Sequence, residues 1–224
     1  MSKSVCFCTE FRFYRSRLGL HEMIDSVNID IDEEMWYSVT PSGISKDHAR
    51  RFGDKRNVLL LDMFTGLGGD LLHVAPNVFS IGCEIDTNRI LLAKSLYSQL
   101  GKSQADFVCC DSINGKSCFR KNSFDIVYLS PPWGYEGVRP RRRAPVFGHR
   151  RLSSLTIDGR LVFEKAQELV RNDIVFYLPR GMDAEEIRSL SASPPHVDIH
   201  VSYDPDDPED SCKVRAITAY FSTQ

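Results

Sequence analysis

The sequence lacks a strong excess of either charge and has no long apolar run. Its 224 residues carry a net charge of −2, so no overall basic field marks it as a nucleic-acid-binding protein, and any site for a polyanion must be a local cluster. No apolar segment is long enough to cross a bilayer, and no secretory signal pattern follows Met1. Because 42% of the residues are hydrophobic, a folded core is expected. We predict a soluble intracellular protein with no membrane partner.

Cysteine and histidine lack the spacing that disulfide frameworks and metal sites use. The seven cysteines are irregularly placed and contain no C-x-x-C pair, which argues against a structural zinc site and against a disulfide framework. The six histidines have no partners at metal-ligand spacing, so we expect no metal. Cys83 and Cys109 lie in apolar runs, where cysteine acts as a small hydrophobic residue. These features predict a reducing compartment.

From residue 58 onward, short apolar runs alternate with helical patterns. The helix after residue 86 is predicted to be N-capped by Thr87 and closed by Gly101 at its C′ position. The predicted strands are 58–62, 78–84, 106–111, 125–130, 174–178, 197–203 and 214–221, and the predicted helices are 42–52, 71–75, 87–100, 158–170 and 184–190. This alternation predicts an α/β fold with a largely parallel seven-stranded sheet flanked by helices, preceded by a short N-terminal helical extension.

The ends of the first three strands carry residues that a cofactor site would need. Asp62 ends the first strand and is followed by the glycine turn 66–69, while Glu84 and Asp111 end the next two strands. In an open α/β sheet, ligands bind at these carboxyl ends. The glycines let the backbone approach a ligand closely. Glu84 is placed to hold a ribose diol, and Asp111 to lie beside an adenine amine.

The spacing of the glycines separates two cofactor classes. The NAD fingerprint G-x-G-x-x-G follows its strand directly, because a pyrophosphate must sit on the helix N-terminus. Here a carboxylate comes first and the glycines follow as G-x-G-G, which suits a cationic cofactor without phosphate. We therefore predict S-adenosylmethionine rather than NAD. The simplest alternative is that these glycines only form a turn.

The segment Ser130-Pro131-Pro132-Trp133 ends the strand that begins near Asp125. Proline has no N–H for a strand ladder and fixes its own φ, so a rigid, extended loop is expected with an indole near its tip. Such a loop suits a flat aromatic ligand.

Two basic segments stand apart from this pattern. Residues 11–17 interleave aromatic residues with Arg12, Arg15 and Arg17, and 139–151 holds six arginines in thirteen residues. The first segment could be an amphipathic helix that packs on the domain, a nucleotide-binding arm, or both. The second is expected to be a poorly structured insertion. It could be a solvated loop or could contact RNA phosphates.

Several motifs together resemble the trimethylguanosine synthase family of RNA cap methyltransferases, and the resemblance covers essentially residues 10–224. The glycine turn alone indicates only a methyltransferase, whereas the SPPWG and WYSVTP segments are more specific. One departure is Gly181, where the family tends to have Asn. The motifs are WYSVTP at 36–41, DMFTGLGG at 62–69, LSPPWG at 129–134, YLPR at 177–180 and ITAYF at 217–221.

The resemblance implies methyl transfer from S-adenosylmethionine to N2 of 7-methylguanosine in a capped RNA, by a class I methyltransferase with a Rossmann-like fold. It implies a nuclear protein, and we expect a monomer. Residues 1–52 would form a cap-binding extension, and 53–224 the catalytic domain. The implied cofactor residues are Asp62, Thr65, Gly66, Glu84, Asp111 and Ser130, with Ser38 and Thr40 closing over them. The implied catalytic and cap-binding residues are Ser130, Pro131, Trp133 and Arg180, with Arg12 and Arg15 also assigned to the substrate.

Three alternatives remain open from the sequence. An amino-group methyltransferase for an internal base of RNA or DNA carries a similar motif at the position of residues 130–133. A cap-binding module without activity would keep the loop but not the strand-end carboxylates. A nicotinamide dehydrogenase is third, and its glycine spacing is missing here. Whether one or two methyl groups are added, which would give the 2,7-dimethyl or the 2,2,7-trimethyl cap, also stays open.

Overall fold

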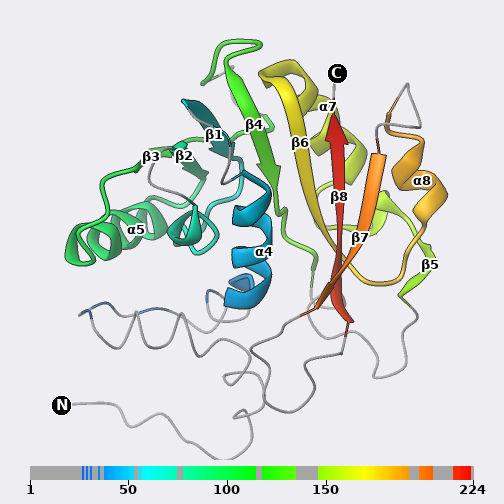
Figure 1. The fold of residues 1–224 in the computed structure, drawn as a ribbon, viewed down its shortest axis with the longest axis horizontal. Coiled ribbons are helices and arrows are strands. Elements are labelled where there is room, and N and C mark those ends of the chain that lie inside the picture. The colour runs from blue at the N-terminus through cyan, green and yellow to red at the C-terminus, as the bar shows by residue number, and fades with distance from the viewer. Residues whose placement is uncertain are drawn as a thin grey trace, which may run out of the picture.

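The computed structural model describes residues 27, 29, 31, 35, 38–52, 55, 57–74, 78–114, 118–134, 146–191, 197–203 and 214–222. Within them, seven strands form one sheet in the order β3-β2-β1-β4-β6-β8-β7 (Figure 1). Neighbouring strands are parallel except around β8, which runs antiparallel to β6 and β7. The strands are β1 (Val58–Asp62), β2 (Val78–Glu84), β3 (Ala105–Cys109), β4 (Phe124–Leu129), β6 (Val170–Pro179), β7 (Val197–Tyr203) and β8 (Val214–Ser222). The predicted largely parallel sheet is confirmed.

Helices cover both faces of this sheet (Figure 1). Side chains of α4 and α5 join one apolar cluster with β1 and β4, and side chains of α7 join a second cluster on the opposite face. The helices are α4 (Ser42–Phe52), α5 (Thr87–Gln99), α7 (Gly159–Leu169) and α8 (Ala184–Arg188), with 3-10 turns η1 (Leu71–His73) and η2 (Leu152–Ser154). In the described part of the chain, no helix has the length and apolar character needed to cross a membrane.

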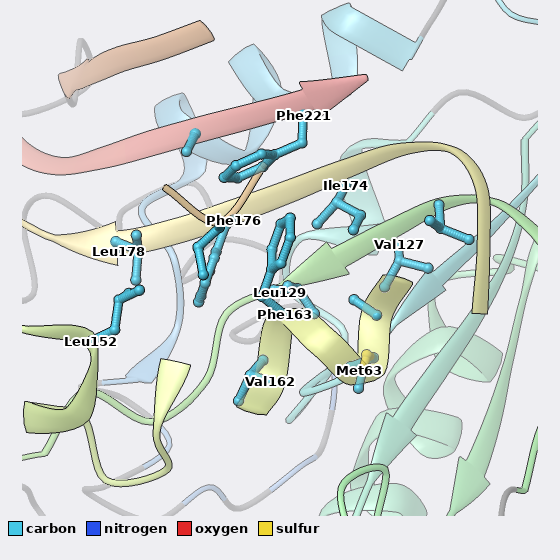
Figure 2. Packing of buried hydrophobic residues seen from close by; sticks show 14 of the residues in the cluster. Met63, Val127, Leu129, Leu152, Val162, Phe163, Ile174, Phe176, Leu178 and Phe221 are labelled. Carbon is cyan, nitrogen blue, oxygen red and sulfur yellow. The ribbon is translucent and has the colours of Figure 1, made fainter. Parts of the chain in front are cut away.

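The face covered by α7 is packed by aromatic rings. Figure 2 shows Phe163 rising from α7 toward Phe176 of β6 and Phe221 of β8. The ring centroid of Phe163 lies 4.5 Å from that of Phe221 and 6.4 Å from that of Phe176. Burying a phenylalanine of this kind contributes about 1.5–3 kcal/mol. This packing holds β6 in place, and with it the residues near the carboxyl end of β6, such as Tyr177.

Helix α4 belongs to the same core as the strands. Its Ile44 and Phe52 are 1% and 4% exposed and lie in one cluster with Leu60 and Tyr128. The predicted helix at residues 42–52 is confirmed. Most of residues 1–41, including Arg12 and Arg15, lies outside the described residues, so the predicted helical extension before α4 stays a prediction there. The boundary at residue 52 also stays a prediction.

Some local predictions at α5 and β3 were wrong. Asp86, not Thr87, is the N-cap of α5, because its carboxylate accepts from the backbone N–H groups of Asn88 and Arg89 at 2.7 and 3.3 Å. Strand β3 ends at Cys109, and Cys109 is exposed rather than part of an apolar interior. The expected helix at 71–75 is only the short turn η1. Gly101 closes α5 with φ of 64°, as predicted.

The prediction that 139–151 is poorly structured was wrong for its last residues. They form the short strand β5 (Phe147–Arg150). The backbone of β5 is held by the turn after β6, because Gly181 N–H donates to the Val146 carbonyl at 2.8 Å and Arg150 N–H donates to the Gly181 carbonyl at 3.0 Å. The sequence did not predict this strand, because its alternation of exposed and partly buried residues spans only four positions. A period-2 pattern cannot be recognised over so short a stretch. Residues 139–145 lie outside the described part.

Candidate active site

A cavity of about 230 Å³ opens at the carboxyl ends of β1, β2 and β3. This is the edge of the sheet where the sequence predicts the cofactor. Seven predicted cofactor residues line it: Ser38, Thr40, Thr65, Gly66, Glu84, Asp111 and Ser130. Four other predicted residues, Asp62, Pro131, Trp133 and Arg180, are not on its wall. Residues that were separated by up to 92 positions in the chain, from Ser38 to Ser130, therefore meet at one cavity.

The glycine turn brings backbone N–H groups to the cavity. Thr65 N–H donates to the Cys83 carbonyl at 2.8 Å, and Gly66 N–H donates to Glu84 Oε2 at 3.1 Å. Gly66 and Gly68 have φ of 53° and 78°, a region that residues with a Cβ enter only at a cost. The turn after β1 is thereby fastened to the end of β2.

Tyr97 of α5 holds the same turn from behind. Its hydroxyl donates to the Gly68 carbonyl at 2.7 Å, and its side chain is 2% exposed. A Cβ on Gly68 would lie 2.9 Å from the Tyr97 ring and 3.0 Å from the ring of Phe107. Gly68 is thus required both for its backbone conformation and for this close approach.

Glu84 is oriented by three backbone amides. Its Oε1 accepts from the N–H groups of Ile85 and Asp86 at 2.8 and 3.0 Å, and its Oε2 accepts from Gly66. A carboxylate offers about four lone-pair positions, so Glu84 keeps acceptor capacity beyond these three bonds. A fixed carboxylate on a cavity wall can accept a hydroxyl of a ribose.

Asp111 starts a turn instead of ending a strand. Its Oδ1 accepts from the N–H groups of Ile113 and Asn114, both at 2.9 Å, and its Oδ2 accepts from the Asn114 side chain at 3.3 Å. Hydrogen bonds from Asn114 and Ile113 hold the pKa of Asp111 below its usual value. Asp111 therefore stays ionised on the cavity wall.

Asp62 lies under the cavity, with 1% of its surface exposed. Its Oδ1 accepts from Phe64 N–H at 3.1 Å. Burial raises the pKa of the Asp62 carboxyl well above its usual value, and the nearby charges of Asp70 and Glu84 raise it further. A cationic ligand above the turn would favour the ionised form again. Together with Asp70, Glu84 and Asp111, it makes this region acidic.

Asp70 is a site residue that the sequence predictions missed. It lines the cavity and accepts hydrogen bonds from Thr40 Oγ1 and Ser45 Oγ, each at 2.8 Å. His48 Nδ1 lies 3.8 Å from its Oδ1. Although burial acts in the opposite direction, hydrogen bonding and charge from His48 and the two hydroxyls lower the pKa of Asp70. The sequence did contain a signal for this residue, because Asp70 directly follows the G-x-G-G turn at 66–69.

The SPPW loop runs from the cavity to a neighbouring surface. Ser130 and Pro132 line the cavity, whereas Pro131 is buried and off its wall. Trp133 lies against Tyr177 of β6, with ring centroids 4.9 Å apart. Arg150 Nη2 donates to the Trp133 carbonyl at 3.0 Å, so β5 supports the loop from outside. The sequence predicted the loop but not this contact with Arg150.

Arg180 follows the last residue of β6, three positions after Tyr177. It is partly buried and lies off the cavity wall. Gly181 has φ of 87°, in the left-handed region that Asn tolerates better than most residues. The departure from Asn at Gly181 therefore keeps the backbone conformation while removing a side chain that could contact a ligand.

Comparison with known proteins identifies the family. The pattern that defines RNA cap guanine-N2 methyltransferases matches residues 57–223. The chain belongs to this family. It is 29% identical over 186 residues to a trimethylguanosine synthase of Schizosaccharomyces pombe, covering 81% of this chain and 75% of that protein. It is 24% identical over 196 residues to one of Saccharomyces cerevisiae, covering 79% and 56%, so it spans little more than half of that relative.

Solved structures support the fold of this methyltransferase. A SAM-dependent methyltransferase from Aquifex aeolicus superimposes with a TM-score of 0.52 at 13% identity, covering 87% of this chain and 100% of that one. A tRNA m1G37 methyltransferase from M. jannaschii superimposes with a TM-score of 0.53 at 14% identity, covering 82% and 50%. The predicted class I, Rossmann-like fold is confirmed.

Membership of this family identifies the reaction that the chain catalyses and the class of cofactor that it uses. The chain is an S-adenosylmethionine-dependent methyltransferase of guanine N2 in an RNA cap. Nothing in these comparisons favours an internal base or an inactive module as an alternative. The cavity wall carries the carboxylates of Asp70, Glu84 and Asp111 and one arginine, Arg89, and this excess of acidic groups fits a cationic cofactor that has no phosphate. Among the described residues, no group of three or more His, Cys, Asp or Glu side chains could hold a metal ion.

Proposed function

We propose that the cavity holds S-adenosylmethionine and that the SPPW loop presents N2 of a 7-methylguanosine cap to it. The observation that carries this proposal is the span of the loop. Ser130 is on the cavity wall, while Trp133, three residues later, lies outside the cavity against Tyr177. One rigid loop therefore contacts both the cofactor cavity and the surface where a base could stack.

For the cofactor we propose separate roles for the strand-end residues. Glu84 accepts a ribose hydroxyl with its remaining acceptor capacity, and Asp111 lies beside the adenine. Thr65 and Gly66 bring the backbone of the turn against the cofactor, and Ser38 and Thr40 close over it. When bound, S-adenosylmethionine supplies an electrophilic methyl group on a cationic sulfur, and the acidic groups around the turn, including Asp62, favour that charge.

For the cap we propose that Trp133 stacks on the base. A 7-methylguanine ring is cationic, and an indole attracts it by about 2 kcal/mol or more when water is excluded. The Ser130 hydroxyl or the Pro131 carbonyl would accept a hydrogen bond from N2 and orient it. Arg180 would face the cap phosphates, and we keep Arg12 and Arg15 as further phosphate contacts. The nucleophile is a neutral amine, so alignment rather than a strong base supplies most of the catalysis.

A calorimetric titration tests the cofactor site. We expect Glu84→Gln to weaken binding of S-adenosylmethionine about tenfold, since a hydrogen bond to a charged group is lost. Glu164→Gln is the matched control, because Glu164 is exposed on α7. Equal affinities for Glu84→Gln, the control and the unmodified protein would show that the cofactor binds elsewhere.

A transfer assay tests the substrate. The unmodified protein should methylate m7GpppG and should leave GpppG, which lacks the charge on the ring, largely unmodified. Transfer to an internal guanine or adenine of uncapped RNA would favour the internal-base alternative instead. Mass spectrometry of the product distinguishes the 2,7-dimethyl from the 2,2,7-trimethyl cap, and we propose that both can form in sequence.

Three further points are proposals of the same kind. Residues 1–52 would form an extension of the catalytic domain that binds the cap. The protein would act as a monomer, which sedimentation measures. It would reside in the nucleus, as the resemblance implies, and both trimethylguanosine synthases named above are eukaryotic proteins. Imaging of the tagged protein tests the location.

A further inference from the structure

Asp70 joins two parts of the chain at the edge of the cavity. It ends the turn that follows β1, and it accepts one hydrogen bond from Thr40 and one from Ser45, each at 2.8 Å. Thr40 lies on the cavity wall, just after Ser38 and Val39, which also line it. Through Asp70, the segment that closes one side of the cavity is fastened to the glycine turn that forms another side.

Ser45 has no place on the cavity wall itself. Its side chain belongs to α4, is 1% exposed, and does not line the cavity. Its hydroxyl donates to Asp70 Oδ1, so its effect on a ligand must act through that carboxylate. This separates it from Thr40 and Asp70, which could each touch a bound molecule.

A buried histidine on the same face of α4 ties the helix to the sheet. His48, 3% exposed, lies one turn after Ser45 and places its Nδ1 3.8 Å from Asp70. Its Nε2 lies 3.0 Å from Thr218 Oγ1 of β8, and its Nδ1 lies 3.1 Å from the Tyr128 hydroxyl of β4. The helix that carries Ser45 is therefore tied to the central strands, and Asp70 is held against a fixed element.

We propose that Thr40, Ser45 and Asp70 form a clamp that closes the cofactor cavity, with Ser45 as a positioning residue that acts through Asp70. The proposal rests on the proposed function, in that the cavity is taken to hold S-adenosylmethionine. The clamp holds the Ser38–Thr40 segment in the position that a bound cofactor requires, so that binding does not have to order that segment. Loss of the clamp weakens cofactor binding and leaves the cap surface at Trp133 intact.

Ser45→Ala is the decisive variant, and Ser80→Ala is its matched control. Ser80 is also a buried serine, 3% exposed, but its hydroxyl has no hydrogen-bond partner among the described residues. We expect Ser45→Ala to raise the Kd and KM for S-adenosylmethionine about tenfold, because a hydrogen bond to a charged group is lost. The KM for m7GpppG and kcat at saturating cofactor should stay within about twofold, since the cap surface does not use the clamp. Ser80→Ala should change none of these values.

A double-mutant cycle tests whether Ser45 acts through Asp70. Asp70→Ala should raise the KM for S-adenosylmethionine by more than Ser45→Ala does, because it removes both hydrogen bonds. Adding Ser45→Ala to Asp70→Ala should then have no further effect, since the partner is already absent. Melting temperatures are measured for every variant, and the comparison is made at a temperature where all of them are folded.

Each result supports or overturns a defined statement. If the unmodified protein binds no S-adenosylmethionine, the proposed function is wrong. If it binds and Ser45→Ala behaves like Ser80→Ala, the clamp is wrong while the proposed function stands. Additive effects of Ser45→Ala and Asp70→Ala, or equal losses for cofactor and cap, would also overturn the clamp.

Discussion

The indole nitrogen of Trp133 donates a hydrogen bond to the backbone carbonyl of Tyr177 at 3.4 Å. The two rings lie 4.9 Å apart between centroids, with a tilt of 48°. Tyr177 belongs to β6 and is 5% exposed, so the indole is fixed by the sheet and not by its own loop alone. Its position is set before any ligand arrives, which lowers the entropic cost of stacking a base on it.

Trp133→Ala should abolish discrimination in favour of the methylated cap. Loss of a cation–π contact of about 2 kcal/mol corresponds to a rise of about 30-fold in KM for m7GpppG. Trp133→Phe keeps an aromatic face but loses the bond to Tyr177, so an intermediate rise is expected. Steady-state kinetics with both cap analogues measures this. Calorimetry should show unchanged binding of S-adenosylmethionine, and a parallel loss of cofactor affinity would contradict the separation of the two sites.

Tyr97→Phe should weaken cofactor binding without touching the cavity. The hydroxyl of Tyr97 donates to the Gly68 carbonyl at 2.7 Å, and its loss removes one of the two hydrogen bonds which that carbonyl accepts, the other coming from Leu72 N–H at 3.2 Å, at a cost of about 1 kcal/mol. The Kd for S-adenosylmethionine, measured by calorimetry, should rise about fivefold. Tyr220→Phe, on β8 and off the cavity wall, is the control and should leave the Kd unchanged. An unchanged Kd for Tyr97→Phe would mean that the turn does not need this support.

Asp62→Asn should stabilise the free protein near neutral pH while weakening cofactor binding. Burial, with the charges of Asp70 and Glu84, raises the folded-state pKa of Asp62 above its usual 3.8. As pH rises past 3.8, the unfolded chain loses this proton first, so the folded state loses relative stability until pH passes the folded pKa. Asn carries no such penalty. The melting temperature should therefore rise at pH 7 and change less at pH 4.

Asp70→Asn is the control of opposite sign in the same melting experiment. The pKa of Asp70 is lowered in the folded state, so its ionised form contributes stability above pH 3.8 that is lost as pH falls through the folded pKa. The substitution should lower the melting temperature at pH 7 and have little effect in stronger acid. If both variants shifted the melting temperature in the same direction at pH 7, the assigned pKa directions would be wrong.

The strands, and the residues at which they end, were the part of the structure that could be predicted from the sequence. Continuous apolar runs indicate strands that are buried on both faces. Asp62, Glu84 and the prolines after Ser130 mark where those runs end, so the edge of the sheet that carries the cavity could be predicted. Contacts between side chains that are far apart in the sequence could not be predicted in this way. The bonds from Thr40 and Ser45 to Asp70, 30 and 25 positions apart, depend on how α4 packs on the sheet. The contact of Trp133 with Tyr177 likewise depends on strand order, which periodicity does not encode.

Gly68→Ala should be more destabilising than Gly66→Ala, although both residues have positive φ. A Cβ added at Gly66 (φ of 53°) would have no atom within 4 Å, whereas a Cβ added at Gly68 (φ of 78°) would lie 2.9 Å from the ring of Tyr97. Backbone strain alone costs about 1–2 kcal/mol at each site, and overpacking adds about 1–3 kcal/mol at Gly68 only. Urea unfolding measures the difference. In a Tyr97→Ala background the gap between the two glycine variants should narrow without closing, because the Phe107 ring, 3.0 Å from the added Cβ, remains. A gap of unchanged size would show that the Tyr97 ring is not its cause.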